Sequence, residues 1–218
     1  MGPDIRQIAP LRCDNSLETL YIDNLCNSYE VSYSKELYDT AFFNAYLIFL
    51  SSLYIKFWQY CKIYEDRSRD FLALHRFEGN HSYEKIADSL TPFYLGKMNQ
   101  KIDERSFRRI FERMCLTVED SKVLKDLIDN RNKLAHANGE TIFKSEEECF
   151  EAVESMIAIA SKLSVGLGSE LKDVFRNEVG RFTHNRVTEW SVYPDVEERF
   201  IKGWYVNQAD INTMVGAR

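Results

Sequence analysis

Apolar residues recur at intervals of three and four along most of this chain, which is the spacing of the buried face of an amphipathic helix. The pattern predicts a long first helix over residues 34 to about 69, with Ser34 as its N-cap and Glu36 in its first turn. A shorter helix is expected over residues 104–115. Its apolar side would carry Phe107, Ile110, Phe111 and Met114.

The next predicted helix has recognisable signals at both ends. Thr117 is a typical N-cap, and Glu119 and Asp120 follow it in the first turn, where negative charge is favourable. Asn138 and Gly139 are residues that commonly end a helix in a left-handed conformation. We therefore expect one continuous helix between these two signals.

Another long helix should begin after residue 145 and extend to about residue 182. Ser145 and Glu148 form the S-x-x-E pattern of a capping box, and the helix could bend at Gly166 and Gly168. The chain has only nine glycines and four prolines in 218 residues. Long periodic segments with few helix breakers predict an all-α fold.

The two ends of the chain differ in character from the middle. Residues 1–32 are interpreted as an N-terminal extension with a short helix, capped by Asn15 or Ser16. Residues 33–182 should form the helical bundle. Residues 183–218 are interpreted as a small C-terminal appendage, with a short strand over 186–193 and a short amphipathic helix over 196–206.

One stretch, residues 41–55, is apolar enough to raise the question of a membrane span. It is shorter than the roughly 20 residues that cross a bilayer, and it contains Asn44, Ser51 and Ser52. We therefore interpret it as a buried central helix, and we expect no membrane association.

Net charge and cysteine content narrow the class of protein. The formal net charge is −6, so any nucleic acid would have to bind in a local cleft rather than on a broadly basic surface. The five cysteines are odd in number and include no C-x-x-C pair. These features are typical of a reduced, cytoplasmic protein without a zinc site.

An arginine interrupts the apolar stripe of the helix predicted to start at Thr117. The stripe consists of Leu124, Leu127, Ile128, Leu134 and Ala135. Arg131 falls on the same face, and a buried cation must be paired or must face an anion. Asn132 and His136 lie one turn apart on the neighbouring polar face.

Two interpretations of this arrangement stay open. In the first, Arg131 extends out of a packed face to water, and His136 helps to close the end of the helix. In the second, the face contacts another subunit, and two copies of Arg131 and His136 meet across a symmetric groove that holds a phosphate.

The segment RNKLAH, residues 131–136, resembles the R-x(4–6)-H motif of the HEPN superfamily, including the polar residue that commonly follows the arginine. The resemblance covers roughly residues 34–182. It implies an up-and-down helical bundle of HEPN type that acts as a metal-independent endoribonuclease, with its active site formed at a homodimer interface. It also implies a setting in toxin–antitoxin or antiviral defence, with a possible antitoxin or regulatory protein as partner.

The resemblance further assigns roles to individual residues. His136 would transfer protons at the ribose 2′-hydroxyl or the leaving oxygen, Arg131 would hold the scissile phosphate, and Asn132 would orient the phosphate or His136. The product would carry a 2′,3′-cyclic phosphate. The chemistry of the side chains agrees, because imidazole exchanges protons near neutral pH and guanidinium grips phosphate through two nitrogens. No cofactor is expected, and no metal-ligand pattern is visible in the sequence.

Other charged residues are weaker candidates. Lys133, Arg105, Arg108 and Arg109 could contact an RNA backbone, but the arginines could equally form a solvated face balanced by acidic neighbours. Glu36 and Asp39 are at the start of the first long helix, where some of the ribonucleases that this chain resembles have an acidic residue near the site. His75, His81 and His184 stand alone in the sequence.

The functional prediction is thus a homodimeric, RNA-cleaving enzyme of the cytoplasm. Two alternatives remain open at this point. One is a catalytically silent HEPN-like module that binds a partner protein or a nucleotide, since helical bundles can keep a fold and lose its chemistry. The other is a structural subunit of a larger complex that docks through residues 183–218.

Overall fold

A computed structural model describes residues 2–13, 15–64, 92–93, 104–136, 141–184 and 197–216, and these form an all-α bundle, as the sequence predicts. The elements along the chain are η1 (Ile5–Ile8), α1 (Ser16–Ser34), α2 (Tyr38–Ile63), α6 (Glu104–Met114), α7 (Val118–Ala135), α8 (Glu146–Gly166), α9 (Gly168–His184), η2 (Glu197–Lys202) and α11 (Gln208–Gly216). An isolated bridge between Pro10 and Asn207 is the β-type pairing in the described part of the chain.

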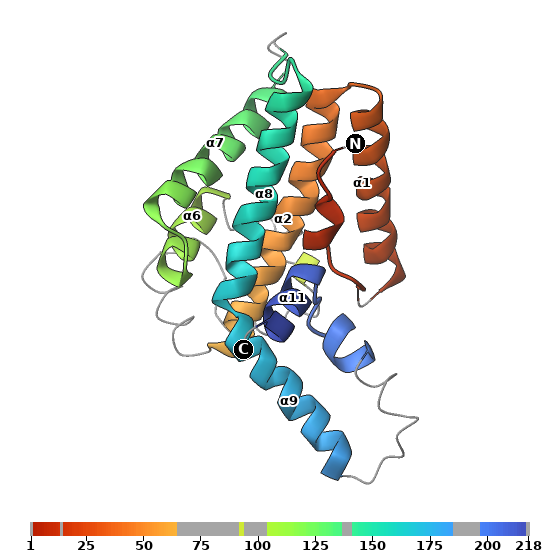
Figure 1. The fold of residues 1–218 in the computed structure, drawn as a ribbon, viewed down its shortest axis with the longest axis vertical. Coiled ribbons are helices and arrows are strands. Elements are labelled where there is room, and N and C mark those ends of the chain that lie inside the picture. The colour runs from red at the N-terminus through yellow and green to blue at the C-terminus, as the bar shows by residue number, and fades with distance from the viewer. Residues whose placement is uncertain are drawn as a thin grey trace.

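Helix α2 is the centre of the bundle. Figure 1 shows it between α1 and α8, with α7 on the far side of α8 and α6 outermost. The chain runs up α1, down α2, up α7 and down α8, so α1 is antiparallel to α2 and α7 to α8, whereas α2 and α8 lie side by side and run in the same direction. Of the described helices, α2 alone is long and apolar enough to cross a membrane, but most of its apolar stretch is buried within the protein. The position of α2 in the core therefore explains its apolar composition.

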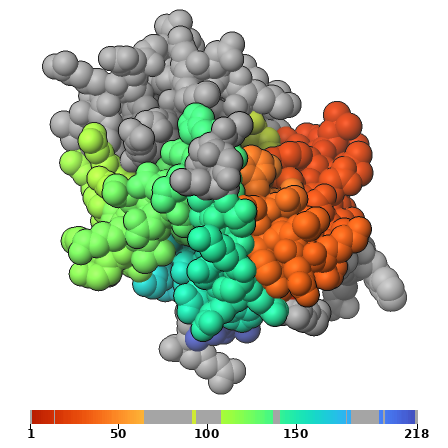
Figure 2. All heavy atoms as spheres, turned by 90° about the horizontal axis from the view of Figure 1, so that it is seen from above, coloured from red at the N-terminus to blue at the C-terminus, as the bar shows by residue number. Residues whose placement is uncertain are grey.

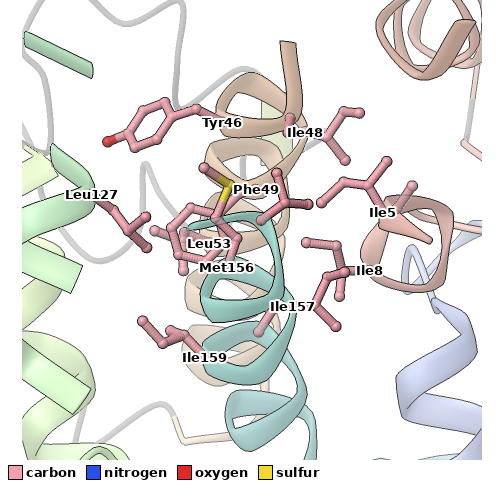
Figure 3. Packing of buried hydrophobic residues seen from close by; sticks show 14 of the residues in the cluster. Ile5, Ile8, Tyr46, Ile48, Phe49, Leu53, Leu127, Met156, Ile157 and Ile159 are labelled. Atoms are coloured by element: carbon pink, nitrogen blue, oxygen red, sulfur yellow. The ribbon is translucent and has the colours of Figure 1, made fainter. Parts of the chain in front are cut away.

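The core covers α2 from both sides. Tyr46 points toward α7, where Leu127 lies, whereas Ile48 points the opposite way toward Ile5 of η1 (Figure 3). All four side chains are almost completely buried. Because most of the surface of α2 is buried by its neighbours, its sequence is apolar nearly all round rather than on a single stripe.

The predicted start of the first long helix is wrong. Ser34 is the last residue of α1, and α2 begins only at Tyr38 and ends at Ile63, short of residue 69. Helix α1 is long because its inner face is buried, and the Tyr29 hydroxyl donates a hydrogen bond to the carbonyl of Pro3 at 3.1 Å. Glu36, in the turn between the helices, has a φ of 59°. This left-handed backbone conformation is uncommon for residues other than glycine, so the sequence gives no signal of the turn at this position.

The predicted helix starts at Thr117 and Ser145 are confirmed. The Thr117 hydroxyl accepts from the amide of Asp120 at 3.2 Å, and the Asp120 carboxylate accepts from the amide of Thr117 at 3.1 Å. The Ser145 hydroxyl accepts from the amide of Glu148 at 3.3 Å, but the Glu148 carboxylate bonds to the amide of Lys144 instead of closing the box on Ser145.

The predicted bend in the last long helix is also present. Helix α8 ends at Gly166, Leu167 intervenes, and α9 begins at Gly168. Figure 1 shows α9 leaving the bundle at an angle to α8. The predicted helix end at Asn138–Gly139, the short helix around Ser82 and the strand at 186–193 lie outside the described residues. Part of the predicted 196–206 helix is present as the π-helical turns of η2.

Both ends of the chain are packed against the central helices. Ile5, Ile8 and Tyr205 belong to the same buried cluster as α2, and α11 contacts η1, α8 and α9. Tyr205 and Trp204 both place their rings about edge-on to Trp58 of α2, at 5.7 and 6.1 Å between ring centroids. Trp204 and Tyr205 therefore pack against α2.

A buried polar network fastens α11 to α2. Lys56 of α2 forms an ion pair with Asp210 of α11, and the ammonium group also donates to Gln59 at 3.1 Å. Gln59 in turn donates to the carbonyl of Trp204 at 2.7 Å, and Asn207 donates to the carbonyl of Ile8 at 3.2 Å. Burial lowers the pKa of Lys56, and the charge of Asp210 opposes that shift.

Candidate functional site

The motif predicted from the sequence lies at the C-terminal end of α7. Arg131 and Asn132 are half-buried in its last turns, and Lys133 is exposed. His136 is the exposed C-cap, with its amide bonded to the carbonyl of Lys133 at 3.3 Å. Figure 2 looks onto this end of the bundle and shows α6 and α7 in green beside the first turns of α8 in teal, with α1 and α2 in red and orange. Because Lys133 and His136 are exposed, a second molecule could contact this end of α7.

Arg131 contacts Asn132 of its own helix and Tyr46 of α2. Its Nη1 donates a hydrogen bond to the side-chain oxygen of Asn132 at 2.9 Å. Its guanidinium carbon lies 5.8 Å from the ring centroid of Tyr46, within the range of a cation–π contact. Tyr46 is itself fully buried in α2. These contacts let an arginine occupy the apolar stripe without being immersed in hydrocarbon.

The apolar stripe leaves the core before α7 ends. Leu124, Leu127 and Ile128 are buried and Leu134 is half-buried, as the periodicity predicts. Ala135 is exposed, so its assignment to the buried stripe is wrong. The buried face of α7 thus narrows through the last turns, which is why Arg131 stands at the edge of the core rather than inside it.

Asp39 connects the start of α2 to the chain that follows the motif. Its carboxylate accepts hydrogen bonds from the amide of Phe143 at 2.8 Å and from the amide of Ile142 at 3.2 Å. The Phe143 ring stacks on Phe42 with 4.4 Å between centroids. Asp39 therefore holds the backbone of the segment that leads into α8. This structural role is sufficient to explain an acidic residue at position 39.

Cys149 lies beneath the same corner of the molecule. Its thiol is buried and is within 3.6 Å of the carbonyl of Tyr38. Burial, with a smaller contribution from the charge of Asp39, raises the pKa of Cys149 to about 12. A thiol with this pKa stays protonated and is a packing group rather than a nucleophile.

The basic residues of α6 are only partly described. Arg108 is half-buried and pairs with Glu112 at 3.9 Å, and Arg109 is exposed. The side chain of Arg105 lies outside the described residues, as do those of His75, His81 and His184. The Arg108–Glu112 pair agrees with the interpretation of a balanced, solvated face for that residue.

The site as the structure describes it brings together Arg131, Asn132 and the ring of Tyr46, with His136 at the exposed helix end. Tyr46 could not be identified from the sequence, because it looks like any other aromatic residue in an apolar run. Within the described ranges, no group of three or more His, Cys, Asp or Glu side chains could hold a metal ion. Chemically, the arrangement offers a fixed cation for a phosphate and an exposed imidazole that can exchange protons.

Comparison of the chain with protein-family models, with curated proteins and with solved structures finds no match. Any assignment of function must therefore be argued from the residues themselves.

Proposed function

We propose that this protein is a metal-independent endoribonuclease whose active site forms where two copies of α7 meet. The observation that carries the proposal is the arrangement of the RNKLAH segment. Arg131 and Asn132 are joined by a hydrogen bond at the edge of the core, and His136 caps the same helix in an exposed position. This combination resembles the HEPN active-site motif in residue type, spacing and place at a helix end.

In the proposed reaction, the substrate is single-stranded RNA and the nucleophile is its own 2′-hydroxyl. One His136 accepts the proton of this hydroxyl as its oxygen attacks the adjacent phosphorus. The bond from phosphorus to the 5′-oxygen breaks, and the second copy of His136 donates a proton to that leaving oxygen. The products are a 2′,3′-cyclic phosphate and a 5′-hydroxyl, and no co-reactant is consumed.

Arg131 would stabilise the charge that develops on the phosphate oxygens. Its orientation is already restricted by Asn132 and Tyr46, so little reorganisation is needed when the phosphate arrives. Asn132 would keep the guanidinium aimed at the substrate. Lys133, exposed one position further along α7, could contact the flanking backbone.

Two copies are part of the proposal because one His136 cannot be both the base and the acid within a single step. A symmetric pair of α7 ends would supply both groups and two arginines. In a cell, such an enzyme would act as a toxin or an antiviral effector, restrained by a regulatory partner until needed. Expression should then inhibit growth, and replacement of His136 should relieve the inhibition.

The decisive experiment measures RNA cleavage by the purified protein in the presence of EDTA, followed by typing of the product ends. His136→Ala should abolish cleavage, and Lys122→Ala, an exposed residue of the same helix, should leave it unchanged. Circular dichroism checks that each variant folds. Cleavage by His136→Ala at the wild-type rate, or products with 3′-hydroxyl ends, would refute the proposal.

A catalytically silent binding module is the second candidate. The observation in its favour is that Arg131 already has partners within one chain, so packing alone can account for its place. A wild-type protein that is harmless on expression and leaves total RNA intact would support this candidate. In that case Arg131→Ala should weaken the binding of a partner without affecting any chemistry.

A further inference from the structure

A cavity of about 230 Å³ lies at the opposite end of the molecule from the motif. Elements α9, η2 and α11 enclose it, and it is partly open to solvent. Its lining consists of Lys172, Phe175, Arg176, Phe200, Ile201, Ile211, Met214 and Val215. Helix α8 has 21 residues and so separates this end from the motif by about 30 Å at the usual helical rise. Figure 1 shows α9 and α11 at the opposite end of the bundle from the C-terminal end of α7, so the cavity has no part in the proposed ribonuclease site.

The floor of the cavity is formed by apolar side chains that pack against one another. Phe175 of α9 and Phe200 of η2 have ring centroids 5.0 Å apart, and Phe200 and Met214 are nearly completely buried. All three belong to a second hydrophobic cluster, separate from the main core, that packs α9 and α11 together. A packed floor with an empty space above it is the usual form of a small-ligand site in a protein.

The polar groups in the lining are both cations. Lys172 and Arg176 are one turn apart on α9, a spacing that puts both on the same face of the helix, and both belong to the lining. Arg176 also pairs with Asp173 at 3.1 Å, but both side chains are mostly exposed. An exposed pair of this kind is weak, and a better placed anion can compete for the arginine.

We propose that this cavity binds a free alkyl carboxylate, the class of ligand that has one aliphatic chain and one negative head. The chain would fill the space between Phe175, Ile211 and Met214, and the carboxylate would lie between Lys172 and Arg176 at the rim. The cations select an anion over a neutral amphiphile, since an uncharged head would gain nothing from them.

The size of the cavity restricts the ligand further. Sites for drug-sized molecules generally occupy about 300–1,000 Å³, and this one is smaller. A single short chain fits that volume, whereas the two chains of a phospholipid would not. The expected source of the carboxylate is therefore free in solution and not a membrane surface.

The test is isothermal titration of the full chain with decanoate below its micelle concentration, beside decanol and vesicles of anionic phospholipid. Decanoate should bind saturably with one site per chain. Decanol should bind on the order of tenfold more weakly, since it lacks the charge. Vesicles should not bind in a sedimentation assay.

Variants locate the site. Val215→Trp places a large ring at the exposed rim, where it should not disturb folding, and Ile211→Trp fills the interior. Each should reduce decanoate affinity by roughly tenfold or more, whereas Val118→Trp, an exposed residue at the start of α7, should not. Lys172→Glu combined with Arg176→Glu should weaken the binding of decanoate and leave that of decanol unchanged. Lys122→Glu combined with Lys125→Glu, at two exposed positions of α7, is the control matched in charge.

Three results would overturn the proposal. Absence of saturable decanoate binding by the wild type would exclude the ligand class. Equal affinity for decanol, with no effect of the double charge reversal, would show that the cations select nothing. Binding that survives both tryptophan variants would place the ligand elsewhere. The assay contains no RNA, so these outcomes are independent of the proposed ribonuclease activity.

Discussion

Lys56 of α2 and Asp210 of α11 form an ion pair in which neither side chain exposes any surface, although the two residues are 154 positions apart in the chain. Lys56 also donates a hydrogen bond to Gln59 at 3.1 Å, and Asp210 also accepts one from the amide of Asn207 at 3.2 Å. A charge pair this deep contributes to stability only as long as it stays complete, because each ion alone would be buried without compensation.

Removing one member of the pair should therefore be strongly destabilising. We expect Asp210→Ala to lower the free energy of unfolding by about 3–5 kcal/mol, measured by urea denaturation. Lys125→Ala, which removes an exposed pair with Asp129, should change it by about 1 kcal/mol or less. The combined variant Lys56→Met with Asp210→Leu should recover much of the loss. Equal effects of Asp210→Ala and Lys125→Ala would contradict this account.

The acid sensitivity of α7 should depend on Asp120. Its carboxylate accepts from Lys162 of α8 and from the amide and hydroxyl of Thr117, and the hydrogen bond from Lys162 is the main reason why the pKa of Asp120 is lowered below its ordinary 3.8. Because the folded-state pKa is the lower one, this stabilisation is fully present above the unfolded value and is lost as pH falls through the folded value.

Urea denaturation of wild type and Asp120→Asn across acidic pH tests this expectation. The wild type should be the more stable protein at neutral pH, and its advantage should shrink toward zero as pH falls below the ordinary pKa of the group. Asp126→Asn, an exposed carboxylate of the same helix, is the control and should show a smaller dependence. An advantage that persists unchanged at low pH would mean that the carboxylate charge is not responsible.

The start of α8 should loosen when Asp39 is replaced. Asp39→Ala removes the acceptor for the amides of Ile142 and Phe143, and hydrogen bonds to a charged group contribute roughly 1.5–3 kcal/mol. Amide hydrogen exchange at these two positions should accelerate, with little change in the middle of α8. Asp39→Asn keeps one acceptor oxygen and should have an intermediate effect. Unchanged exchange in Asp39→Ala would show that the segment is held by other contacts.

A conservative change at Arg131 should separate packing from chemistry. Arg131→Lys keeps a cation near Tyr46 but loses the planar fork that can hold a phosphate and bond to Asn132 together. We expect the single-turnover rate of RNA cleavage to fall by roughly a hundredfold while the thermal midpoint stays nearly unchanged. If Arg131→Lys cleaved RNA at the wild-type rate, the guanidinium group would not be acting on the phosphate.

The parts of the fold that could be predicted from the sequence are those specified by nearby residues. The caps at Thr117 and Ser145 are satisfied within three positions, and the break near Gly166 is local as well. The start of α2 was predicted wrongly because Ser34 and Glu36 look like a helix start. The true turn depends on the burial of Tyr29 and Tyr33 against the first residues of the chain.

In the candidate site too, some residues could be predicted from the sequence and others could not. The R-x(4–6)-H spacing and the neighbouring Asn132 are visible in six residues, and α7 places them together at its end. The supporting residues are not visible in this way. Tyr46 contacts Arg131 from another helix, and Asp39 contacts a segment more than a hundred positions later, so no local pattern could connect them.

The buried pair between α2 and α11 also has a consequence for the order of events during synthesis. Asp210 leaves the ribosome on the order of ten seconds or more after Lys56, at ordinary rates of translation. Until then, α2 can collapse onto α1 and η1, but its lysine has to stay hydrated, and the end of the helix near Trp58 remains uncovered. The nascent chain thus keeps an apolar surface open until α11 arrives, and that interval is when a chaperone would be most useful to it.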